Sequence, residues 1–203
     1  METKIKICGL SRLQDIETAN RLKPDYIGLM FYRPSCRYIT KETARKLSEA
    51  LDPAITPVAV FLDEDFDVAA DIATSGIAKM IQLHGHEDDD YIRRLKDISG
   101  LPIIRAYQVK EAADLERAAA SAADHIMLDS GPGGTGQTFD WQLLKEMDRP
   151  YFLAGGLKPE NVREAIDLLH PYAVDVSSGV ETDRLKDPEK MRRFVENVRG
   201  TDF

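Results

Sequence analysis

The chain has 203 residues, of which 43% are hydrophobic and 31% charged, and its formal net charge at pH 7 is −8. These are the values of a globular chain with one core, so we expect a single catalytic domain over residues 1–203 and exclude intrinsic disorder. The negative charge repels nucleic acid and anionic lipid, so neither is expected as a partner, although a local cluster of amides or arginines can still bind an anionic small molecule.

No apolar stretch approaches the roughly 18–20 residues needed to cross a bilayer. The first residues, Met1–Lys4, lack the basic and apolar regions of a signal peptide. The two cysteines, Cys8 and Cys36, lie outside any CxxC motif, and free thiols are typical of a reducing compartment. We therefore expect a cytoplasmic protein without membrane contact. The spacing of the four histidines does not suggest zinc, so no metal is expected.

Eight short β-rich runs follow one another along the chain. They are Lys4–Cys8, Asp25–Phe31, Pro57–Leu62, Met80–His84, Pro102–Tyr107, His125–Asp129, Tyr151–Ala154 and Tyr172–Ser177. Helical segments lie between them. They are the segment through Leu22 with Ser11 and Gln14 as its capping box, Lys41–Leu51 after Thr40, Asp88–Ile98, Val109–Ala120, Asn161–Leu169 with Pro159 in its first turn, and a last helix that begins at Asp187-Pro188.

A strand followed by a helix, repeated about eight times, predicts an α/β fold of the (βα)₈ TIM-barrel type. An open doubly wound sheet usually has about five or six strands, so the count favours the barrel. Several strands are almost continuously apolar, as strands buried on both faces of a parallel sheet are.

Cys8 and Asp129 each close one of these apolar strands. The C-terminal ends of barrel strands converge on one mouth, where the chemistry of such enzymes lies. A thiol and a carboxyl at two strand ends can therefore act as base and acid on one substrate. Taken alone, Cys8 fits a buried small residue better than a base, and Asp129 fits a helix cap or a turn residue.

Strands seven and eight end in glycine-containing turns, at Gly155-Gly156 and at Ser178-Gly179. The corresponding loops of many barrels bind phosphate, because glycine lets backbone N–H groups approach the oxygens. Either turn alone is explained by a tight strand-to-helix connection. Their occurrence together on these two strands favours a phosphorylated small-molecule substrate.

The loop Gly131–Gly136 matches the spacing G-x-G-x-x-G after a strand. A dinucleotide fingerprint requires a helix to begin at the last glycine, whereas here Gln137–Asp140 intervene. The loop suits a flap over the barrel mouth better than a nucleotide site.

Three further residues are candidates for substrate contact. His84 ends the fourth strand and fits a ligand contact and a structural hydrogen bond equally well. Arg37 lies on a long loop and could be a solvated residue. Asp175 lies within an apolar strand and so requires a partner or a role.

At these residues the sequence resembles the phosphoribosylanthranilate isomerase family of tryptophan biosynthesis, nearly from end to end. The matching motifs are Lys6–Leu10, Gln82–Gly85, Asp129-Ser130, Gly133–Gly136, Phe139–Trp141, Leu153–Leu157 and Asp175–Glu181. The resemblance implies a (βα)₈ barrel that performs an Amadori rearrangement of N-(5-phosphoribosyl)anthranilate to 1-(2-carboxyphenylamino)-1-deoxyribulose 5-phosphate. Such chemistry requires no metal and no organic cofactor.

The resemblance also implies roles for individual residues. Cys8 would be the general base, working as a thiolate, and Asp129 the general acid, which must carry a proton in the complex. Arg37 would contact the anthranilate carboxylate, and Asp175 matches an aspartate of the site. The turns at Gly155-Gly156 and Ser178-Gly179 would hold the phosphate.

The sequence departs from the family pattern in two places. Cys36 replaces a proline before Arg37, which removes a backbone restraint near that arginine. The segment Thr182–Leu185 precedes Lys186-Asp187 where the family often has glycine, and this alters a loop near the phosphate.

Three other functions compete with this one. The sugar-phosphate isomerase of histidine biosynthesis shares the barrel and the reaction type but uses two aspartates, and Cys8 argues against it. A bifunctional enzyme is a minor alternative. A non-catalytic phosphate-binding barrel or thiol sensor is the alternative from another class. Monomer and homodimer are both compatible with a barrel of this size.

Overall fold

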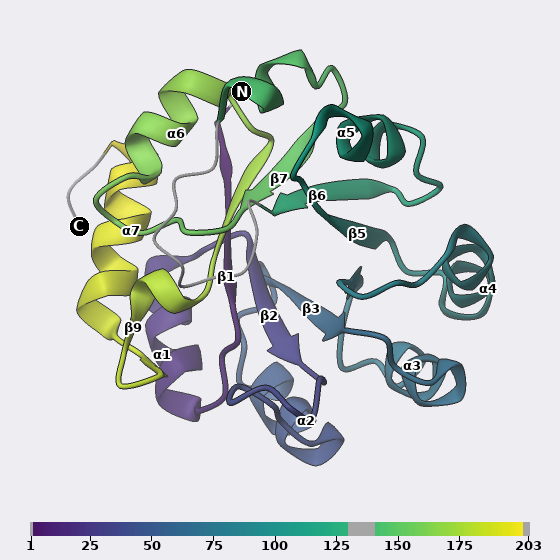
Figure 1. Cartoon of the computed structure of the whole chain (residues 1–203). Helices are drawn as coiled ribbons and strands as arrows, with labels where there is room; N and C mark the ends of the chain where they lie inside the picture. The colour runs from purple at the N-terminus through teal and green to yellow at the C-terminus, as the bar shows by residue number, and fades with distance from the viewer. Residues whose placement is uncertain (1, 130–140, 201–203) are drawn as a thin grey trace.

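The chain folds into a closed parallel barrel surrounded by helices (Figure 1). The computed structural model describes residues 2–129 and 141–200. Each strand pairs with the next in chain order, and β8 pairs with β1 to close the ring. The strands are β1 Lys4–Cys8, β2 Tyr26–Met30, β3 Thr56–Phe61, β4 Met80–Leu83, β5 Ile103–Gln108, β6 His125–Asp129, β7 Tyr151–Ala154 and β8 Ala173–Val176. The predicted (βα)₈ barrel is confirmed.

Helices follow the strands and cover the outside of the barrel (Figure 1). They are α1 Leu13–Leu22, α2 Lys41–Glu49, α3 Phe66–Ala73, α4 Asp89–Ser99, α5 Ala112–Ala119, α6 Val162–Leu169 and α7 Pro188–Arg199. The sixth unit differs from the ideal repeat, because a 3₁₀ helix, η1 Trp141–Glu146, stands where an α-helix is expected. A short antiparallel hairpin, β9 Glu181–Thr182 and β10 Leu185–Lys186, separates β8 from α7.

Polar side chains set the helix starts, and two of these differ from the expected ones. The capping box predicted for Ser11 and Gln14 is wrong. The carboxylate of Asp15 instead accepts the backbone N–H groups of Ser11 and Arg12, at 2.9 and 3.0 Å, so α1 begins one residue after Arg12. Pro159 lies ahead of the N-cap residue Asn161 rather than in the first turn of α6.

The barrel interior is a separate apolar cluster from the layer between strands and helices. Its members come from alternate positions of the strands and are Cys8, Val58, Val60, Met80, Ile104, Ala106, Met127, Phe152, Ala154 and Ala173. Successive strand residues point to opposite faces, so every second residue of a strand points inward. The same alternation turns the polar residues Lys6, Gln82 and Asp175 inward, where all three are buried.

The glycine-rich segment Gly131–Gly136, expected as a flap, lies outside the described residues. Among the helices of the described residues, none is long and apolar enough to cross a membrane.

Candidate active site

The strand ends that were expected to carry chemistry lie at one end of the barrel, because all eight strands are parallel. Cys8 is the last residue of β1 and Asp129 the last of β6. Each follows an inward-facing residue by two positions, Lys6 in one strand and Met127 in the other, so both point into the barrel mouth. His84 follows the buried Gln82 of β4 in the same way.

Cys8 is packed tightly and is only 4% exposed. Its register partner on β2 is Gly28, and a Cβ atom at that position would lie 2.5 Å from Sγ. Gly28 therefore provides the space that the thiol occupies, and any side chain there would displace it. Burial raises the pKa of the Cys8 thiol, and so does Asp175, whereas Lys6 and Lys186 lower it. Burial prevails and the pKa is raised, so the site favours the thiol form.

Lys6 and Asp175 form an ion pair inside the barrel, at 2.8 Å between Nζ and Oδ1. The two residues are register partners on β1 and β8, and the side chain of Lys6 is fully buried. Burial alone lowers the pKa of Lys6, but Asp175 and Cys8 outweigh it and the pKa is raised. A carboxylate at this inner position thus has the partner that its burial requires.

Asp129 lies next to His84, with 3.3 Å between its Oδ2 and the imidazole Nε2. The other ring nitrogen, Nδ1, is 3.0 Å from the amide nitrogen of Gln82. With the amide nitrogen donating to Nδ1, the imidazole carries its proton on Nε2, the ring nitrogen that lies next to Asp129. The amide orientation of Gln82 therefore sets the tautomer that His84 presents to Asp129.

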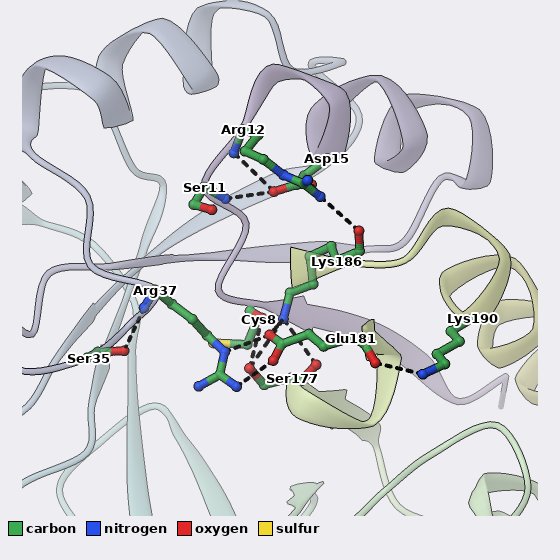
Figure 2. Close-up of polar contacts among 10 residues, drawn as sticks. All are labelled: Cys8, Ser11, Arg12, Asp15, Ser35, Arg37, Ser177, Glu181, Lys186 and Lys190. Carbon is green, nitrogen blue, oxygen red and sulfur yellow. Dashed lines mark hydrogen bonds and ion pairs between the residues drawn. The ribbon is translucent and has the colours of Figure 1, made fainter. Parts of the chain in front are cut away.

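Arg37 is held by Glu181, which is the first residue of the β9–β10 hairpin (Figure 2). The guanidinium Nε and Nη2 each donate to one carboxylate oxygen at 2.6 Å, which is the bidentate geometry of a strong ion pair. The stem of Arg37 runs over Gly9, where a Cβ atom would lie 2.5 Å from Cδ and where φ is +82°. Both facts require glycine at that position.

Lys186 completes this cluster from the other strand of the hairpin. Its ammonium donates to the Glu181 carboxylate, to the Ser177 carbonyl at 3.0 Å and to the Ser177 hydroxyl at 3.4 Å (Figure 2). The Ser177 hydroxyl in turn donates to the carbonyl of Cys8 at 3.1 Å. The hairpin is thus tied to the strand end that carries the thiol.

The two glycine turns expected to bind phosphate are in contact. Gly155 and Gly156 both have positive φ, at +89° and +65°. Gly179 lies directly over the β7 turn, since a Cβ atom there would be 1.9 Å from the carbonyl oxygen of Leu157. Ser178 and Gly179 belong to a short 3₁₀ turn. The backbone of both turns therefore meets at one part of the mouth.

The residues that end the strands can be identified from the sequence, whereas the residues that hold them are missed. Lys6, Gln82 and Lys186 are buried, and Glu181 is half-buried with only 6% of its side chain exposed. Lys6 pairs with Asp175, Gln82 contacts His84, and Glu181 pairs with both Arg37 and Lys186. For Lys6 a signal is present, because a charge within an apolar strand requires a partner, the same argument that identifies Asp175. No group of three or more His, Cys, Asp or Glu suited to a metal ion occurs within residues 2–129 and 141–200.

The pairing of Glu181 gives an expected dependence of stability on pH. Burial alone raises the pKa of Glu181, but hydrogen bonds from Arg37 and Lys186 prevail and lower it below the ordinary value of 4.5. A depressed pKa stabilises the fold above that ordinary value, and this stability is lost as pH falls through the lower pKa of the folded protein. Urea unfolding over an acidic pH series should therefore show a steeper loss for the wild type than for Glu181→Gln. An equal loss of stability with falling pH in the wild type and in Glu181→Gln would contradict a lowered pKa at Glu181.

Comparison with known proteins identifies the family of this chain. A family model described as N-(5′-phosphoribosyl)anthranilate (PRA) isomerase matches residues 5–197. A relative of that name from Thermoanaerobacter sp. (strain X514) is 45% identical over 203 residues, 97% of this chain and 98% of the relative. The crystal structure of phosphoribosyl anthranilate isomerase from Thermotoga maritima superposes with a TM-score of 0.90 at 38% identity, covering 98% of this chain and 99% of that one.

A second structure of such an isomerase, in complex with reduced 1-(o-carboxyphenylamino)-1-deoxyribulose 5-phosphate, has a TM-score of 0.87 at 37% identity, with 98% of this chain and 99% of that chain covered. The family model and the relative both span nearly the whole chain. This chain belongs to the N-(5′-phosphoribosyl)anthranilate isomerase family.

Proposed function

We propose that this chain catalyses the Amadori rearrangement of N-(5′-phosphoribosyl)anthranilate to 1-(2-carboxyphenylamino)-1-deoxyribulose 5-phosphate, by general acid–base catalysis. The observation that carries the proposal is the common inward orientation of Cys8 and Asp129 at the ends of β1 and β6. A base and an acid on two strands of one mouth can act on one sugar from different sides. Family membership supplies the substrate.

Asp129 is the proposed general acid. Its proton goes to the ring oxygen of the aminoaldose, the C1′–O bond breaks, and a Schiff base forms. The His84 imidazole next to the carboxyl orients it and stabilises the carboxylate that remains after proton transfer. Because Asp129 retains some exposure, with a fifth of its side chain accessible, it can reach a bound ligand.

Cys8 is the proposed general base. The Schiff base acidifies the C2′ hydrogen, and the thiolate accepts that proton. The resulting enolamine becomes the ketone when C1′ gains a proton and the C2′ hydroxyl loses one. The substrate isomerises without net gain or loss of atoms. Since burial favours the thiol, the nearby ammonium groups of Lys6 and Lys186 matter for the working thiolate.

The two ends of the substrate have separate proposed contacts. The backbone at Gly155-Gly156 and Ser178-Gly179 binds the phosphate, which the contact between the two turns supports. Arg37 binds the anthranilate carboxylate through the edge of its guanidinium that Glu181 leaves accessible. Asp175 contributes through its ion pair with Lys6 below the thiol.

We further propose that residues 1–203 act as one catalytic domain, in a monomer or a homodimer, in the reducing environment of the cytoplasm. Both cysteines are free thiols, and a reducing compartment preserves them in that form. No metal or organic cofactor has a role in the steps above.

The direct test is turnover of N-(5-phosphoribosyl)anthranilate, generated freshly and followed by the loss of its fluorescence. We expect rapid loss that depends on enzyme concentration. The aminoaldose substrate of the histidine-pathway isomerase serves as the comparison and should turn over far more slowly. Well-folded protein without activity on the anthranilate substrate would support a non-catalytic phosphate-binding barrel instead.

Replacing either proton-transfer group should mainly affect turnover. Cys8→Ser and Asp129→Asn should each lower kcat by at least about 10²-fold, the low end for positioned acid–base groups. Steady-state kinetics of purified variants provide the measurement. The exposed Cys36, replaced by serine, is the matched control and should keep wild-type kcat. Turnover close to wild type in Cys8→Ser or Asp129→Asn would refute the assigned role.

Replacing Arg37 should mainly affect substrate binding. A hydrogen bond to a charged group contributes about 1.5–3 kcal/mol, so Arg37→Ala should raise KM by about 10- to 100-fold with a smaller change in kcat. The exposed Arg33 of the same loop is the control, and Arg33→Ala should leave both constants close to wild type. A loss confined to kcat would argue against a carboxylate anchor at Arg37.

A further inference from the structure

The β9–β10 hairpin buries a charged side chain and leaves the apolar side chain next to it exposed. Lys186 is 4% exposed, whereas its neighbour Leu185 is 46% exposed. Burial of an ammonium costs several kcal/mol even in a relaxed protein interior, and burial of a leucine is favourable. The hairpin is therefore arranged so that the lysine, and not the leucine, faces the barrel mouth.

The contacts of Lys186 suit the charged form of the amine. An ammonium has three N–H donors, and three acceptors surround this one: the carboxylate of Glu181 and both the carbonyl and the hydroxyl of Ser177. A neutral amine would have only two donors for them. Burial lowers the pKa of Lys186, and the adjacent Glu181 carboxylate and Cys8 oppose that change.

The charges around Cys8 do not balance when its sulfur is a thiol. In the described part of the chain, the charged side chains that act on Cys8 are Lys6 on β1, Arg37 after β2, Asp175 on β8 and Lys186 on β10. Glu181 on β9 pairs with two of them, so the cluster holds three cations and two carboxylates. One positive charge is in surplus. A single anion at the sulfur would neutralise the cluster.

The surplus charge is that of Lys186. Asp175 pairs with Lys6 at 2.8 Å, and Glu181 pairs with Nε and Nη2 of the Arg37 guanidinium at 2.6 Å. Lys186 shares the carboxylate that Arg37 already neutralises (Figure 2). Through Ser177, which donates to the Cys8 carbonyl, Lys186 also fixes the end of β1 relative to the hairpin.

We propose that Lys186 is a positioning residue for the isomerase: its buried ammonium holds Glu181 against Arg37 and supplies the unmatched positive charge that stabilises the Cys8 thiolate. The inference rests on the proposed function for its catalytic meaning. Its physical content, a thiolate stabilised by a lysine of the hairpin, can be measured without substrate.

The experiment follows thiolate formation at Cys8 by ultraviolet absorbance across an alkaline pH series. The Cys36→Ser variant leaves Cys8 as the one thiol that absorbs, and the double variant Cys8→Ser/Cys36→Ser is the blank. Lys186→Met, close in length and uncharged, should move the titration upward by at least about one pH unit, which is a tenfold lower thiolate fraction below the midpoint. Lys190→Met is the matched control, because Lys190 donates to the backbone carbonyl of Glu181 at 2.7 Å rather than to its carboxylate. It should leave the titration unchanged.

A second variant makes the test independent of how well Lys186→Met folds. Glu181→Gln removes a negative charge from the same cluster and should move the thiolate titration in the opposite direction, to lower pH. A titration unchanged in Lys186→Met, or moved upward in Glu181→Gln, would overturn the proposal.

Kinetics then separate this inference from the proposed function. In Lys186→Met, kcat should be low at neutral pH and recover as pH rises, whereas simple structural damage lowers kcat at every pH. If the thiolate titrations shift as expected but the wild-type protein shows no turnover, the proposed function is refuted. The stabilisation of the Cys8 thiolate by Lys186 would still hold.

Discussion

The alternation of side chains along parallel strands is the constraint on which this site depends. Every second residue of a strand must point into the closed barrel, and the apolar ones seal its interior. The same period carries Cys8, Asp129 and Asp175 inward without any special local structure. A shift of one residue in the register of β1 would turn the thiol into the helix layer and place Ile7 at the mouth. The geometry of the site is therefore a property of the whole barrel.

Electrostatics imposes a second condition, because the same burial that positions the thiol disfavours its ionised form. Burial prevails over the two nearby ammonium groups, and the pKa of Cys8 is raised. The surrounding ion pairs limit this penalty rather than abolish it. Lys6 is neutralised by Asp175 within the barrel, and the hairpin adds Lys186 from outside it. The base strength of the thiol is thus set jointly by β1, β8 and the hairpin.

The strands and the residues that end them could be predicted from the sequence, because apolar runs and strand ends are local patterns. All eight predicted strands lie within one residue of the observed bounds. The errors concern features that depend on particular contacts. The start of α1 depends on Asp15 reaching back to Ser11 and Arg12, and α6 has its N-cap at Asn161, after Pro159. Glu181 and Lys186 could not be assigned, because their burial results from a hairpin packed against another part of the chain.

We expect one sugar phosphate to lie between Cys8 and Asp129, with its phosphate at the turns after β7 and β8. The most direct measurement is a crystal structure of this chain with the reduced product analogue bound by its structural relative. We expect the phosphate on the backbone of Gly155-Gly156 and Ser178-Gly179, and the Cys8 sulfur and the Asp129 carboxyl in contact with the ligand from different sides. A ligand bound at the mouth that touches neither side chain would contradict the account.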